Sequence, residues 1–143
     1  MNGKSPFPKY RYPEPIKITN RQWPDRIITK PPVWASVDLR DGNQALPAPM
    51  SPSQKLEYFK MLVKLGFKEI EVSFPAASQD DFDFVRMLIE SRIIPEDVRI
   101  SVLTQAREEL IVRTLEALKG VPSAILHIYL ASSDLHRKFV FGM

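Results

Sequence analysis

The sequence has no cysteine, only two histidines and only five glycines among its 143 residues. Without cysteine the chain can form neither disulfide bridges nor a thiolate zinc site. It also lacks a run of about 18 apolar residues, so we expect no membrane-spanning helix and no membrane partner. The first residues lack the apolar stretch of about 7–15 residues found in signal peptides. We therefore expect a cytoplasmic protein.

Positive charge is concentrated in one part of the chain. The net charge is +3, but residues 1–32 hold seven Lys and Arg against two acidic residues. The remainder is therefore slightly acidic, whereas a nucleic-acid binder carries its basic surface on the folded domain. We expect no nucleic-acid partner.

Proline is also concentrated in residues 1–32, which hold seven of the 13 prolines. Proline fixes φ and removes a backbone donor, so regular secondary structure is disfavoured there. We predict an extended, proline-rich N-terminal arm over residues 1–32 and a folded domain over residues 33–143.

The domain is expected to alternate strands and helices. Strands are predicted at residues 34–39, 67–74, 98–103 and 124–130. A helix should begin at Ser51-Pro52-Ser53-Gln54, which reads as a capping box with proline at the first helical position, and end at Gly66. Further helices follow Ser78 and carry the apolar positions of residues 110–118.

Strict alternation of strands and helices predicts a parallel sheet with crossover connections. A doubly wound sheet and a (β/α)8 TIM barrel both satisfy this order. A complete barrel takes about 250 residues, so residues 33–143 would form about half of one, truncated within an element.

The two faces of the predicted strands differ in polarity. Ile70, Val72 and Phe74 share one face of their strand, and Glu69, Glu71 and Ser73 the other. In the strand predicted at residues 124–130, His127 lies on the face opposite to that of Leu126, Ile128 and Leu130. Polar groups on one face suit a barrel lumen with a site at its C-terminal mouth. Two alternatives stay open: glutamates facing solvent on an open sheet, and a core histidine.

The segment Asp38-Leu39-Arg40-Asp41-Gly42-Asn43-Gln44 follows the first predicted strand. Its carboxylates are ligands of the kind Mg²⁺ and Mn²⁺ prefer, and the Arg40 guanidinium offers a fork of donors for an oxyanion or carboxylate. Gly42 would permit a positive φ and a close approach of the backbone to a ligand. An equally good interpretation is a turn with an Asp–Arg pair, such as Asp38 with Arg40.

That segment resembles the opening motif of the Claisen-condensing and lyase (β/α)8 enzymes. Other stretches narrow the resemblance to the longer type of the 2-isopropylmalate synthase family, and they lie at residues 21–24, 68–79, 81–86, 102–107 and 127–129. The resemblance implies a metal-dependent condensation of acetyl-CoA with 2-oxoisovalerate to 2-isopropylmalate and CoA, the first committed step of leucine biosynthesis.

The resemblance also implies roles for four residues. Asp41 would bind a divalent metal, Mg²⁺ first and Mn²⁺ or Zn²⁺ as alternatives. Arg40 would be catalytic and substrate-binding, and Glu71 and His127 would bind substrate. The family's His-x-His pair does not occur in this sequence, so the remaining metal ligands would lie outside this chain, which we expect to be inactive alone. The complete enzyme is expected to be a homodimer.

Two other functions remain open. Homocitrate synthase, or another acyl-CoA-condensing relative, would share the opening motif. A non-catalytic, truncated interaction module that pairs through its arm would need no complete site.

Overall fold

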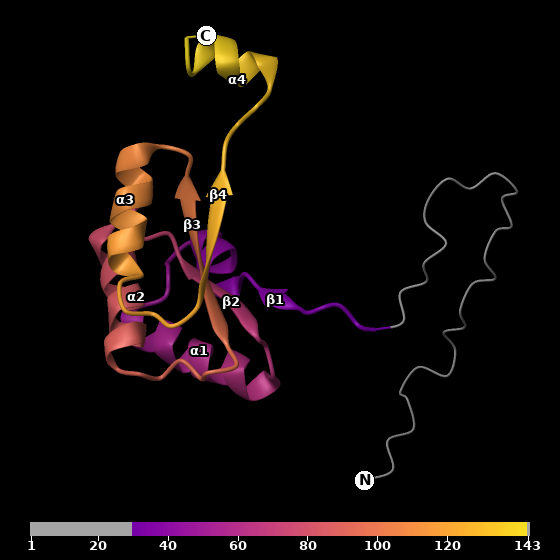
Figure 1. Ribbon diagram of the computed structural model, residues 1–143, viewed down its shortest axis with the longest axis vertical. Coiled ribbons are helices and arrows are strands. Elements are labelled where there is room, and N and C mark those ends of the chain that lie inside the picture. The colour runs from indigo at the N-terminus through magenta and orange to yellow at the C-terminus, as the bar shows by residue number, and fades with distance from the viewer. Residues whose placement is uncertain (1–29, 143) are drawn as a thin grey trace, which may run out of the picture. The chain divides into compact units, whose positions relative to one another are not determined.

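Strands and helices alternate along residues 30–142, which are the residues that the computed structural model describes (Figure 1). The arm predicted for residues 1–32 lies almost wholly outside this range. In chain order the elements are β1 (Ala35–Ser36), a π-helical turn η1 (Asp38–Gly42), α1 (Pro52–Leu65), β2 (Glu69–Ser73), α2 (Gln79–Glu90), β3 (Arg99–Gln105), α3 (Glu108–Ala117), β4 (Ala124–Tyr129) and α4 (Asp134–Phe139).

The four strands form one parallel sheet in the order β1-β2-β3-β4. This confirms the predicted alternation and the parallel pairing. In a doubly wound sheet the strand order reverses and helices cover both faces. Here the strand order follows the chain, and α1, α2 and α3 pack on one core against β2 and β3. The arrangement is that of consecutive units of a barrel.

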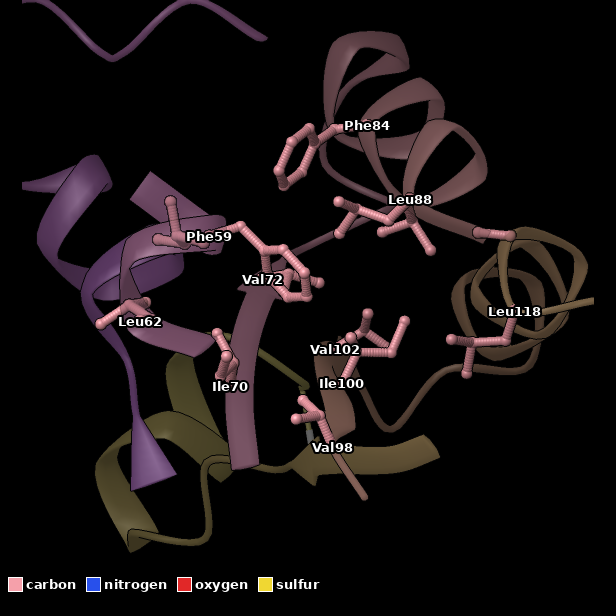
Figure 2. Packing of buried hydrophobic residues seen from close by; sticks show 13 residues of the cluster. Phe59, Leu62, Ile70, Val72, Phe84, Leu88, Val98, Ile100, Val102 and Leu118 are labelled. Carbon is pink, nitrogen blue, oxygen red and sulfur yellow. The ribbon is translucent and has the colours of Figure 1, made fainter. Parts of the chain in front are cut away.

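The core lies between that helical layer and one face of the sheet (Figure 2). Ile70 and Val72 of β2 and Ile100 and Val102 of β3 are fully buried. The helices contribute apolar side chains to the same cluster, among them Phe59, Leu62, Phe84, Val85, Leu88 and Ala117. Because these side chains come from one face of each strand, the opposite face is left for polar groups.

The predicted ends of the first helix are confirmed. The Ser51 side chain accepts from the backbone N–H of Gln54, and the Gln54 side chain accepts from the N–H of Ser51, which completes a capping box. Gly66 ends α1 with φ of 97°, a left-handed conformation that glycine adopts without a Cβ penalty. Ser78 likewise caps α2 by accepting from Asp81 N–H.

The first strand is shorter than predicted. Residues 34–39 were expected to be extended, but β1 holds only Ala35 and Ser36. The chain then turns sharply, because the N–H groups of Arg40, Asp41 and Gly42 all donate to the carbonyl of Val37. Leu39 is buried through this turn rather than through strand alternation.

The last described segment also differs from expectation. No helix was predicted between residues 131 and 138, but α4 forms there, beyond the carboxyl end of β4 (Figure 1). Ser133 caps it by accepting from His136 N–H. No residue of α4 is buried, so the apolar periodicity that reveals a core-facing helix is missing. Among residues 30–142 no helix is both long and apolar enough to cross a membrane.

Candidate functional site

A cluster of polar side chains lies on the sheet face opposite the helices. Arg40 comes from η1, just after β1, Glu71 from β2, Ser101 from β3 and His127 from β4. Glu71 pairs in register with Ser101, and His127 with Leu103. Alternation along each strand therefore brings these side chains to one face, as predicted for Glu71 and His127.

Glu71 is the centre of this cluster. Its Oε1 accepts from Arg40 Nε. Its Oε2 lies 2.7 Å from His127 Nδ1 and 3.5 Å from the Ser101 hydroxyl. One carboxylate thus contacts side chains from three other elements, and its contact with His127 spans 56 residues of sequence. The alternative in which Glu71 faces solvent is wrong, because only 5% of its side chain is exposed.

The other charged and polar side chains near Glu71 are more exposed to solvent than Glu71 itself. The Arg40 side chain is 16% exposed, the His127 side chain 48% and the Asp41 side chain 65%. Arg40 Nη1 donates to Asp41 Oδ1 at 2.7 Å. The guanidinium is therefore held at two edges by carboxylates, and the imidazole of His127 is accessible from the open side of the sheet.

Two details of the predicted turn are corrected. Asp38 does not pair with Arg40, because its Oδ2 accepts from the Ser36 hydroxyl at 2.5 Å. Within residues 30–142 the glycines with a positive φ are Gly66, Gly120 and Gly142, and Gly42 is not one of them. Gly42 lies inside η1, so the expected use of a positive φ at this position is wrong.

Ser73 lies on the opposite face from the one predicted. The pairing of β2 with β3 shifts between Glu71 and Ser73, so that Val72 is an extra residue. After this shift the Ser73 hydroxyl points toward α2 and donates to Asp81 Oδ1 at 2.8 Å. An irregular strand breaks the two-residue alternation on which the prediction rested.

Lys55 of α1 was not predicted from the sequence as a candidate site residue. Lys55 Nζ forms an ion pair with Asp81 at 3.0 Å, although Lys55 is only 5% exposed. Both residues line a cavity of about 550 Å³ that also borders Arg40. The position of Lys55 on the buried face of α1 was the available signal, since a lysine there needs a partner.

Asp41 alone does not make a metal site. Its carboxylate can supply one hard oxygen ligand, with Oδ1 already accepting from Arg40. Within the part of the chain that the structure describes, no three His, Asp or Glu side chains come together as metal ligands. The described residues therefore do not fit a divalent ion by themselves.

Comparisons with known proteins place these observations in a family. The model of the HMGL-like family matches residues 32–143. A 2-isopropylmalate synthase of Paraburkholderia xenovorans is 59% identical over 140 residues, which cover 98% of this chain and 24% of the relative. Those of Clostridium acetobutylicum and Schizosaccharomyces pombe are both 58% identical, over 94% and 96% of this chain and 24% of each relative.

The chain therefore spans about a quarter of the length of the curated relatives it matches. Its four parallel strands with alternating helices are a partial (β/α)8 barrel, as the sequence predicted. The chain belongs to the HMGL-like family and corresponds to an N-terminal part of 2-isopropylmalate synthases.

Proposed function

We propose that the protein to which these residues belong is a 2-isopropylmalate synthase, which condenses acetyl-CoA with 2-oxoisovalerate to give 2-isopropylmalate and CoA. The observation that carries this proposal is the cluster of Arg40, Asp41, Glu71 and His127 on the open face of a partial barrel, in a chain 58–59% identical to enzymes of that name. The reaction opens leucine biosynthesis.

The position of Arg40 supports a role in the condensation. Its guanidinium is oriented by Glu71 and Asp41, which leaves N–H groups to meet oxygen atoms of a bound substrate. Loss of a methyl proton from acetyl-CoA moves an electron pair onto the thioester oxygen, and a fixed donor stabilises that oxyanion. The enolate carbon then bonds to the ketone carbon of the oxo acid, whose C=O electron pair moves onto the ketone oxygen; that oxygen takes up a proton in place of the one lost from the methyl group, and water cleaves the thioester to release CoA.

An apolar neighbour of the cluster supports a branched oxo acid over 2-oxoglutarate. Leu103 pairs in register with His127 and lies on the same face as Ser101, two residues before it. A site for 2-oxoglutarate would need a second cation, in addition to Arg40, for the distal carboxylate, because an unpaired buried charge is costly. The leucine instead suits the isopropyl group of 2-oxoisovalerate, which argues against homocitrate synthase.

The complete enzyme is further proposed to be a cytoplasmic homodimer that needs a divalent metal, Mg²⁺ first. Asp41 would supply one ligand, and the others would come from outside residues 30–142. The non-catalytic module is the second candidate, and it is favoured only by the incomplete ligand set within the described residues.

A coupled assay of the longer protein tests the proposal. CoA release should be faster with 2-oxoisovalerate than with 2-oxoglutarate at equal concentration, and the product should be 2-isopropylmalate by mass. Faster release with 2-oxoglutarate would favour homocitrate synthase. No CoA release with any 2-oxo acid, in the presence of Mg²⁺, Mn²⁺ or Zn²⁺, would favour the non-catalytic module.

A further inference from the structure

Glu71 presents only hydrogen-bond acceptors to its neighbours. An ionised carboxylate has no proton to donate, and Arg40 Nε, which contacts Oε1, can only donate. His127 Nδ1 lies 2.7 Å from Oε2, so that nitrogen must carry a proton to make the bond. Among the described residues, the other hydrogen-bond partners of the Glu71 carboxylate are Arg40, from η1, and Ser101, from β3.

We infer that Glu71 is a positioning residue, which fixes the neutral ring of His127 as the tautomer with its proton on Nδ1. The Nε2 atom is then a bare acceptor on a side chain that is 48% exposed. The resemblance implied direct substrate contact for Glu71, but its side chain is 5% exposed and both its oxygens are occupied. Glu71 therefore acts through its two neighbours.

The arrangement offers a substrate two complementary groups. Arg40 provides N–H donors, which suit a carbonyl or carboxylate oxygen, and His127 provides an acceptor, which suits an O–H or an acidic C–H. A carbonyl compound with a proton on the adjacent carbon carries both features. The chemical meaning of this pairing rests on the proposed function, but the tautomer itself does not.

The variant Glu71→Gln tests the inference because an amide has one acceptor oxygen and one donor nitrogen. Arg40 Nε can only donate, so it should take the amide oxygen and leave the NH₂ group facing His127. The Nδ1 atom must then accept, which moves the ring proton to Nε2. We therefore expect the variant to invert the tautomer.

Long-range ¹⁵N–¹H spectra of the imidazole rings provide the measurement, since they distinguish a protonated from an unprotonated ring nitrogen. The sample is the longer protein to which these residues belong, because the 143-residue chain alone is expected to associate, and the His127 signals are those that disappear in His127→Gln. The neutral ring should carry its proton on Nδ1 in the parent chain and on Nε2 in Glu71→Gln. Ser101→Ala is the matched control and should leave the tautomer unchanged, because its contact with Glu71 is long at 3.5 Å.

A neutral His127 protonated on Nε2 in the parent chain would overturn the inference, as would a proton that stays on Nδ1 in Glu71→Gln. If that variant does not fold, the parent spectrum still decides the outcome. The measurement requires no turnover, so a wrong proposed function would leave its result unaffected.

Discussion

Lys55 of α1 and Asp81 of α2 form an ion pair at 3.0 Å in which the lysine is almost completely buried. Asp81 also accepts from the Ser73 hydroxyl at 2.8 Å, and the Lys55 ammonium lies 4.5 Å from the centre of the Phe84 ring. The pair therefore joins two helices and the end of β2 beside the cavity that borders Arg40.

Replacement of Lys55 by Met should lower the free energy of unfolding by about 1–3 kcal/mol, because it leaves the Asp81 carboxylate without its cation. The loss should fall short of that for a fully buried pair, since the Asp81 side chain is 29% exposed. The double variant Lys55→Met/Asp81→Asn should lose less than the sum of the single changes in urea unfolding. Additive losses would mean that the pair contributes no coupling.

Gly66→Ala should destabilise the fold by roughly 1 kcal/mol or more, because the residue adopts φ of 97° at the end of α1. No atom lies within 4 Å of the added Cβ, so the penalty is one of backbone conformation. Gly42→Ala is the control: its Cβ would meet Asp38 Cβ at an ordinary 3.7 Å, and its φ is not positive. Equal changes in Tm for the two variants would contradict this account.

In the complete enzyme, Arg40→Lys should lower kcat by about 10²-fold or more, judged from the removal of one oxyanion donor. Lysine keeps the charge but not the planar fork that meets Glu71 and Asp41 together. Metal affinity should change little, whereas Asp41→Ala should abolish metal-dependent turnover. Arg99→Lys, at an exposed pair with Glu69, is the matched control with unchanged kcat. A near-normal kcat in Arg40→Lys would remove Arg40 from the chemistry.

The purified 143-residue chain should associate in solution and show no turnover. The outer edges of β1 and β4 have no strand partner within the described sheet, and unpaired edges template association. Ile128 and Leu130, at the end of β4, are exposed apolar side chains. Size-exclusion chromatography and hydrogen exchange provide the measurement. A sharp monomer peak with slow exchange in β1 and β4, or measurable 2-isopropylmalate production, would contradict this prediction.

The Asp97 carboxylate should stabilise the fold at neutral pH and lose this effect in acid. Its hydrogen bond and charge interaction with Lys68 lower the pKa of this carboxyl below its usual 3.8. A lowered folded-state pKa stabilises the fold above the unfolded value, and the contribution disappears as pH falls through the folded value. Tm of Asp97→Asn should therefore lie slightly below the parent at neutral pH and converge with it in acid. Lys68→Met should behave alike, and a constant difference at every pH would refute the linkage.

Local rules predicted much of this fold. The capping box at Ser51 and the stop at Gly66 depend on a few neighbouring residues, so they could be found from the sequence. The shared face of Glu71 and His127 followed from regular alternation. Residues 35–39 could not be predicted in the same way, because an apolar run does not reveal that Val37 accepts three N–H groups in a turn.

Contacts between distant residues set the rest of the site. The shift near Val72 arises from pairing with β3, about 30 residues later, and the meeting of Glu71 with His127 spans 56 residues. Sequence patterns indicated that both side chains face the lumen but not that one carboxylate joins them to Arg40. The α4 helix was not predicted because none of its residues is buried, so its sequence has no apolar periodicity.

The extra residue in β2 has a consequence for protein engineering. Glu71 and Ser73 are two positions apart, yet they point to opposite faces, one toward the polar cluster and the other toward α2. A strand of regular pairing cannot display such a pair, since its side chains repeat every second residue. A designed barrel that borrows Glu71 together with the Ser73–Asp81 anchor must therefore also borrow Val72, or the graft would lose one of the two contacts.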